Sequence, residues 1–209
     1  MSYNNTVWAQ FERWNPVPFL LAGGVYGLIA AVYGFRAGTG TGLTVPPPVI
    51  FVCLLVVFVG LLGLYPRLAS GNPLLALCGL GFLALTTAVI FTTIGLTVLP
   101  LGVTLGKPTI VALIMSVVGG STLTLTTFGV AGLRTGGHLR PVGGFLLVMA
   151  TGTAGVVVAM FVYSNPTPAW VGFVVSLVFV ISLGSIGYVF RREDVPVEPS
   201  QSSGDVTAD

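Results

Sequence analysis

Residues 48–65 read PVIFVCLLVVFVGLLGLY, and none of these eighteen positions carries a charged side chain. A helix rises about 1.5 Å per residue, so about 20 predominantly apolar residues cross the hydrocarbon core of a bilayer. With its apolar flanks, this stretch is long enough to do so. It predicts a transmembrane helix, and the same pattern continues in both directions along the chain.

Five further apolar runs of similar length surround this stretch, and turn-forming residues separate them. The six segments are about 17–35, 48–65, 74–98, 109–133, 141–163 and 169–190. The loop from Arg36 to Pro48 is rich in Gly, Thr and Pro, Pro66 is expected to end the second segment, and Lys107-Pro108 opens the fourth. We therefore predict an all-α, polytopic transmembrane bundle of about six helices, with a transmembrane domain over residues 17–192.

The composition agrees with a lipid-facing exterior. Hydrophobic residues make up 54% of the chain, charged residues only 7%, and the mean hydropathy is +0.99. Soluble domains are typically about a quarter charged. All six acidic residues lie near the chain ends, at Glu12 and from Glu193 onward. The net charge of +2 and the absence of a basic stripe predict that the lipid bilayer, and not nucleic acid, is the partner.

Basic residues favour the cytoplasmic side of a membrane protein, so their distribution predicts the orientation. With the N-terminus inside, six basic residues fall on the cytoplasmic side and two on the other side. The six are Arg13, Arg67, Arg134, Arg140, Arg191 and Arg192, and the two are Arg36 and Lys107. We therefore expect a multi-pass protein of the cell membrane with both termini in the cytoplasm (N-in/C-in).

The two ends of the chain differ from the apolar centre. Residues 1–16 contain Trp8, Phe11 and Trp14 at roughly helical spacing, which predicts an interfacial N-terminal segment with its rings at the headgroup level. Residues 193–209 are rich in Pro, Ser, Asp and Glu and have no hydrophobic period. This composition predicts a disordered, acidic cytoplasmic tail.

The style of the whole chain resembles a known group of proteins. Seven of the eight basic residues are Arg, the tail is acidic, and the apolar segments are heavy in Gly, Thr and Val. In these respects the chain resembles the uncharacterised small multi-pass membrane proteins of halophilic archaea. The resemblance is compositional, with no diagnostic motif, and it implies a membrane location but no particular function.

Small residues recur on one face of several segments and predict where helices pack against one another. These candidate packing residues are Gly23 and Gly27 in the first segment, Ala112, Ser116, Gly120 and Thr124 in the fourth, and Thr151 and Gly155 in the fifth. The second segment has only Gly60 and Gly63 and is bulky elsewhere. We therefore expect the second helix to face lipid.

The same stripes allow a second interpretation, in which hydroxyl groups line a polar path through the membrane. The candidate lining residues are Thr86, Thr93 and Thr127, together with Thr124. Proline at position 100 could mark an irregular segment at membrane depth. Helix packing is the simpler interpretation of these faces, and a continuous hydrated cavity would favour the polar path.

Reactive groups are missing from the predicted spans. No Asp, Glu, Lys, Arg or His falls inside the six segments, although such residues mark most proton-coupled and cation sites in membranes. We therefore predict no catalytic residue, no metal site and no cofactor. Cys53 and Cys78 lie at different predicted depths, so we interpret both as small buried hydrophobic residues without a disulfide.

The loop between the fourth and fifth segments holds the chain's one histidine. Arg134, His138 and Arg140 lie within seven residues and are a candidate contact for lipid headgroups or another anion. A short cytoplasmic loop that obeys the positive-inside rule explains the same residues more simply.

Asn-Pro pairs in two loops resemble the aquaporin plan, in which Asn-Pro-Ala motifs open two half-helices. Here Asn72-Pro73 is followed by Leu74 and Asn165-Pro166 by Thr167, so neither motif is complete. The chain after Asn165 is also too short for a half-helix and a full span. We interpret each pair as a helix start, with Asn as N-cap and Pro as first helical residue.

Together these observations predict a non-catalytic accessory or scaffolding subunit of a membrane complex, which acts by association with other membrane subunits or with itself. The alternative is a small transporter or channel for a neutral or lipophilic solute.

Overall fold

The computed structural model describes residues 16–42, 44–98, 106–163 and 168–193. These residues form six α-helices and no strand. The helices are α2 (Pro16–Thr39), α3 (Pro47–Gly71), α4 (Pro73–Val98), α5 (Lys107–Thr135), α6 (Leu139–Tyr163) and α7 (Ala169–Glu193). All six are long and apolar enough to cross a membrane, which confirms the predicted all-α bundle.

Two helix ends differ from the prediction. Helix α3 continues through Pro66 to Gly71, so the expectation that Pro66 ends the second segment is wrong. A proline removes one backbone N–H, and near the end of a membrane helix other groups replace the lost bond. Helix α2 likewise continues past Arg36 to Thr39, whose hydroxyl donates a hydrogen bond of 2.8 Å to the carbonyl of Phe35.

Asn72 alone separates α3 from α4. Its N–H donates to the carbonyl of Leu68 (2.9 Å), and its own carbonyl accepts the N–H of Ala76 (3.1 Å). One residue therefore ends one helix and begins the next, with Pro73 in the first helical position. No half-helix lies between these two spans. Asn165-Pro166, the interfacial segment before Pro16 and the tail beyond Glu193 lie outside the described residues.

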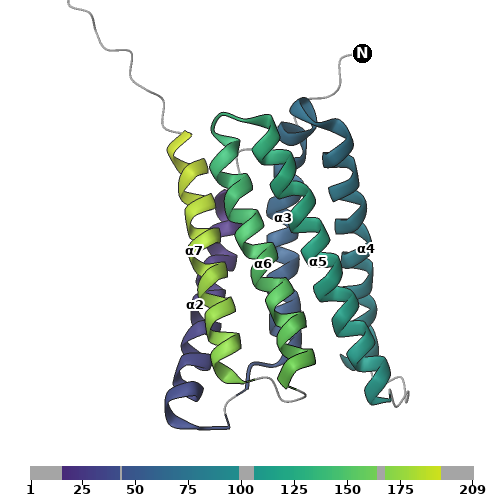
Figure 1. Ribbon diagram of the computed structural model, residues 1–209, viewed down its shortest axis with the longest axis vertical. Helices are drawn as coiled ribbons and strands as arrows, with labels where there is room; N and C mark the ends of the chain where they lie inside the picture. Colours follow the sequence, from purple (N-terminus) through teal and green to yellow (C-terminus); the bar gives the residue numbers. More distant parts are fainter. Residues whose placement is uncertain (1–15, 43, 99–105, 164–167, 194–209) are drawn as a thin grey trace, which may run out of the picture.

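The six helices form a closed ring in chain order (Figure 1). Each helix contacts the next one, α7 returns to contact α2, and α3 also reaches across to α5. Successive helices run in opposite directions, so α2 begins and α7 ends at the same end of the bundle, at the top of Figure 1. We call this the terminal end, and the other the opposite end.

Helix α3 is the most buried member of this ring, so the expectation that it is the helix placed toward lipid is wrong. Half of its most apolar window is buried inside the protein, the largest share of any of the six helices. Its buried side chains include Phe58, Leu61, Leu64 and Leu68, each no more than 2% exposed. Much of the bulk that suggested contact with lipid packs instead against α2, α4 and α5.

Aromatic rings join α3 to the first and last helices near the terminal end. The fully buried ring of Phe19 (α2) lies over Gly60 of α3, where an added Cβ would be 2.7 Å from a ring carbon. The same ring stacks with Phe190 of α7 at a centroid distance of 6.2 Å. The guanidinium of Arg67 (α3) lies 5.4 Å from the Phe190 ring, within the range of a cation–π interaction.

Helices α5 and α6 approach each other at three glycines. A Cβ added at Gly143 of α6 would lie 2.6 Å from the carbonyl oxygen of Gly129 and 2.6 Å from the backbone nitrogen of Leu133. Gly132 of α5 faces the same position, and a Cβ added at Gly132 would lie 3.0 Å from the Cα of Gly143. The two backbones touch here, which requires glycine on both sides.

Helices α2 and α7 form a second close antiparallel pair. A Cβ added at Gly23 would lie 3.5 Å from the Cβ of Leu183. Toward the terminal end, Gly187 accepts the side chain of Leu20, and toward the opposite end, Gly172 accepts the ring of Tyr33. Glycines on α7 thus receive side chains of α2 along most of the contact, and the chain's first and last described helices close the ring.

The adjacent glycines Gly143 and Gly144 provide a direct test of the α5–α6 contact. Gly143→Ala would place its methyl group against backbone atoms, and overpacking of this kind costs about 1–3 kcal/mol. A Cβ at Gly144 meets nothing within 4 Å, so Gly144→Ala is expected to leave stability unchanged or to raise it through helix propensity. Thermal unfolding in detergent, followed by circular dichroism, measures both. Equal melting temperatures for the two variants would contradict the contact.

Candidate functional site

The candidate site is a hollow of about 320 Å³ between α6 and α7. Thr151, Gly155 and Ala159 of α6 line it with small side chains at four-residue spacing. Valines of α7, among them Val174, form the facing wall, and Trp170 lies at its edge. The Trp170 ring is half exposed and meets the Tyr163 ring edge-on at 6.1 Å. An aromatic pair of this kind is typical of the membrane interface.

Thr151 and Gly155 were expected to pack between helices of this chain. Both are instead exposed on the surface of α6, and a Cβ at Gly155 would meet nothing within 4 Å. Gly152, one position from Thr151, is the glycine of this region that packs on α7, where its Cβ would lie 3.5 Å from Val178. The predicted face therefore lies open toward the membrane.

The other candidate packing residues are divided between contacts and open surface. Gly23 lies against α7 and Gly120 lies against the side chain of Thr86 in α4, whereas nothing lies within 4 Å of a Cβ at Gly27. Thr124 is fully buried. Ala112 and Ser116 are exposed, so the α5 stripe lies partly between helices and partly on the surface.

The candidate polar path consists of hydroxyls that bond within their own helices. Thr86 donates to the carbonyl of Phe82 and Thr93 to that of Val89, each at 2.7 Å. Thr127 contacts the carbonyls of Leu123 and Thr124, each at 2.9 Å. Thr86 and Thr93 are buried, and neither these residues nor Thr127 line the α6–α7 hollow. Thr86 and Thr127 lie in the α4–α5 contact, against Gly120 and Gly79, and all three hydroxyls donate to backbone carbonyls.

One hydroxyl pair connects two helices and was not predicted. The oxygens of Thr122 (α5) and Thr153 (α6) are 2.8 Å apart. Each also lies 2.8 Å from a carbonyl of its own helix, that of Val118 or of Ala150. The two hydroxyls have one proton each and therefore cannot donate to all three contacts. One threonine donates to the other, which in turn donates to the carbonyl of its own helix. The pair lies in the same α5–α6 contact as Gly143.

The glycines that bring α5 and α6 together were also not predicted. Gly129 and Gly132 are three residues apart, and Gly143 follows the turn that joins the helices. A search for small residues at four-residue spacing passes over them. The facing positions of a helical hairpin lie at roughly equal distances from the turn. Glycines shortly before a turn and shortly after it are therefore the signal that identifies such a pair.

The basic candidates lie on the turn between α5 and α6, at the terminal end. Gly136 and Gly137 have φ values of 79° and 57°, the left-handed region that glycine adopts without strain. Arg134, His138 and Arg140 are exposed around these glycines, and the buried Leu139 between them anchors the turn. The structure thus places all three basic side chains on one short surface turn.

The two cysteines differ in environment. Cys53 is buried, as expected, but Cys78 is exposed, so its interpretation as a buried residue is wrong. Cys78 lies on the outer face of α4, where lipid accepts a small apolar side chain as readily as a protein core does. Both are free thiols. Among the described residues, His, Cys, Asp and Glu do not gather in groups of three or more.

The described residues therefore define a class: a multi-pass membrane protein built as a bundle of six apolar helices. Comparison of the chain with protein-family models, with curated proteins and with solved structures finds no match. The class accordingly stands on the helices and their packing alone.

The hydroxyl pair gives a second prediction. Thr122→Val and Thr153→Val, singly and together, should show a coupling free energy of about 0.6 kcal/mol, the average for hydrogen bonds between membrane helices. Thr92 is exposed and bonds to the carbonyl of Ala88 in its own helix, so Thr92→Val and Thr153→Val should be additive. Chemical unfolding in detergent provides the free energies. Additivity of the first pair would exclude an interhelical bond.

Proposed function

We propose that this chain is a non-catalytic accessory or scaffolding subunit that binds a transmembrane helix of another membrane protein, or of a second copy, in the hollow between α6 and α7. The observation that carries the proposal is the open small-residue face of Thr151 and Gly155. In lipid, helices associate through close packing at small residues and not through the hydrophobic effect. A face of this kind favours a helix as its occupant.

The contrast with the internal contacts supports this assignment. Where Gly143 and Gly187 meet another helix of the chain, a neighbouring atom occupies the space that a side chain would need. At Gly155 that space is open. Glycine in the middle of a helix lowers its stability by about 0.5–1 kcal/mol relative to alanine. Close packing of a partner helix at this glycine would offset that loss.

The chemistry of the chain favours association over catalysis. The sequence places no Asp, Glu, Lys, Arg or His inside the six apolar segments predicted above, and membrane enzymes and coupled transporters generally use such groups. The threonines of the candidate polar path direct their hydroxyls to carbonyls of their own helices. Transport of a neutral or lipophilic solute remains the alternative.

Filling the hollow should disrupt association without disturbing the fold. Gly155→Leu adds a large side chain where the protein leaves space, so we expect the variant to be produced and to unfold like the wild type. The yield of crosslinked neighbours, measured in native membranes, should fall at least tenfold. The fraction of oligomer, measured by mass in solution after extraction in a mild detergent, should fall by the same factor.

The matched control is Gly24→Leu, which places the same side chain on the exposed surface of α2. A Cβ at Gly24 also meets nothing within 4 Å, and Gly24 does not line this hollow. It should retain the association. A wild-type protein that is a monomer without crosslinked neighbours would refute the proposal, and solute flux into proteoliposomes above that of empty vesicles would favour the alternative.

We also propose that both termini are cytoplasmic. The support is the excess of arginine predicted for that side, including Arg67, Arg134 and Arg140. A fluorescent protein fused at the C-terminus should fluoresce, and alkaline phosphatase at the same position should be inactive. Fusions truncated after Gly106, at the opposite end, should give the reverse pattern. Active phosphatase at the C-terminus would contradict the proposal and indicate the opposite orientation.

A further inference from the structure

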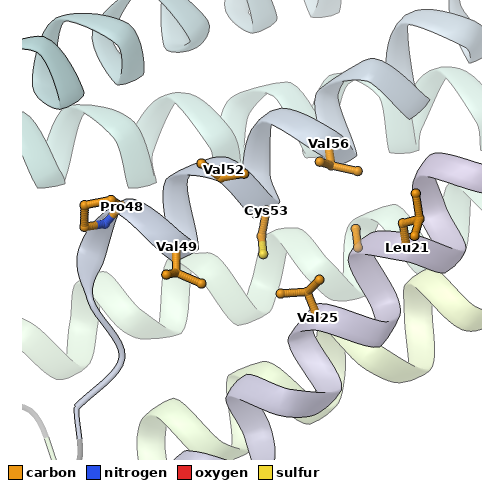
Figure 2. A pocket seen from close by; sticks show the side chains of 8 residues that line it. Leu21, Val25, Pro48, Val49, Val52, Cys53 and Val56 are labelled. Carbon is orange, nitrogen blue, oxygen red and sulfur yellow. The ribbon is translucent and has the colours of Figure 1, made fainter.

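A second hollow of about 310 Å³ lies between α2 and α3 (Figure 2). Leu21 and Val25 of α2 face Val49, Val52, Cys53 and Val56 of α3 across it. Every lining side chain is apolar, and Leu21, Val49 and Val52 are exposed, so the hollow opens toward the membrane. An apolar cavity of about 150 Å³ holds a six-carbon ring, so this one has room for roughly a dozen carbon atoms.

This hollow differs from the α6–α7 hollow in its lining. Branched valines and leucine project into it, and none of its lining residues is glycine. Close approach of another helix backbone needs small residues. The lining therefore favours a thin, flexible chain that fits between side chains.

Arg36 lies on the same face of α2 as the hollow, nearer the opposite end. It follows Val25 by eleven residues, which is about three helical turns, or about 16 Å. It also follows Pro16 by twenty residues, about 30 Å along the helix, which equals the hydrocarbon thickness of a bilayer. If α2 spans the membrane, Arg36 lies at the headgroup level and Val25 lies near the bilayer centre. The hollow continues past the centre to Leu21, which precedes Arg36 by fifteen residues, or about 22 Å.

Among the described residues, no carboxylate lies at Arg36's end of the bundle. Residues 14–192 contain no Asp or Glu. Glu193 ends α7 at the terminal end, whereas Arg36 lies near the opposite end. A guanidinium at the membrane surface binds phosphate through two parallel hydrogen bonds, and the phosphates of the lipid headgroups lie at this level.

We propose that the α2–α3 face binds a bilayer phospholipid, with one acyl chain in the hollow and its phosphate on the guanidinium of Arg36. The cation and the hollow each recognise one part of the ligand. The site is separate from the α6–α7 hollow, and the proposal does not depend on the protein acting as a subunit.

The test is native mass spectrometry of the delipidated, full-length protein in detergent, titrated with three probes. These are a phosphatidylglycerol with two 18-carbon chains, a diacylglycerol with the same chains, and inorganic phosphate. The wild type should bind the phospholipid at least tenfold more tightly than the diacylglycerol, since a charge-assisted bond to phosphate contributes about this factor. It should bind inorganic phosphate hardly at all.

Two variants separate the parts of the site. Arg36→Gln should abolish the preference for phospholipid over diacylglycerol. Val52→Trp should fill the hollow and weaken binding of both lipids. The controls are Arg192→Gln, which removes an exposed arginine at the terminal end, and Val174→Trp, which fills the α6–α7 hollow. Both should bind like the wild type.

The proposal is overturned if Arg36→Gln keeps the preference, if Val52→Trp binds both lipids as tightly as Val174→Trp does, or if the controls lose binding to the same degree. Loss of a crosslinked membrane protein from Val52→Trp, with lipid binding unchanged, would assign the hollow to a partner helix and would also overturn it.

Discussion

The contact between the backbones of α5 and α6 at Gly143 shows the constraint on which the bundle depends. A methyl group at this position would lie 2.6 Å from the carbonyl oxygen of Gly129. Lipid is as apolar as leucine, so helices gain little from hiding apolar surface and must gain from close packing. Glycine permits that packing between α5 and α6, and again between α2 and α7. The two pairs form much of the ring, and bulky α3 lies between α2 and α4 and also contacts α5.

The sequence was sufficient to predict the number and class of the helices, because the bilayer sets the length of each apolar run. It was not sufficient to place them. Small residues indicate where two helices approach closely, and the scarcity of such residues in α3 suggested a lipid-facing helix. Large side chains such as Phe58 and Leu61 can equally pack against neighbouring helices, and sequence alone does not distinguish lipid from protein as the apolar neighbour.

The candidate site was predictable in part for the same reason. Thr151 and Gly155 were identified as a packing face, but the sequence does not say whether the neighbour belongs to this chain. Thr122 and Thr153 are 31 residues apart, and only the antiparallel register of α5 and α6 brings them within 2.8 Å. Cys78 was interpreted as buried because apolar runs contain both lipid-facing and protein-facing positions. Each of these errors about the site concerns the neighbour of a residue and not its preference for an apolar environment.

The internal and external faces of the bundle use different chemistry. Inside, glycines and phenylalanines such as Gly60 and Phe19 interlock, and threonine hydroxyls bond to nearby carbonyls. Outside, two hollows remain open, one lined by small residues and one by branched side chains. A helix needs the first kind of surface and an acyl chain fits the second. The proposals for a partner helix and for a phospholipid therefore follow from the shapes of the linings and, for the phospholipid, also from Arg36.

Closure of the ring by α2 and α7 is the central claim of this account, because it joins the first described helix to the last. A Cβ at position 23 lies 3.5 Å from the Cβ of Leu183, at the short edge of the disulfide range of about 3.5–4.5 Å. The direct measurement is oxidation of Gly23→Cys combined with Leu183→Cys, with both native cysteines replaced by serine and a protease site in the loop between α2 and α3. The account predicts that the fragments stay joined after cleavage until they are reduced, and that Gly24→Cys in place of Gly23→Cys leaves them separate. Separate fragments in the first case, or joined fragments in both, would contradict it.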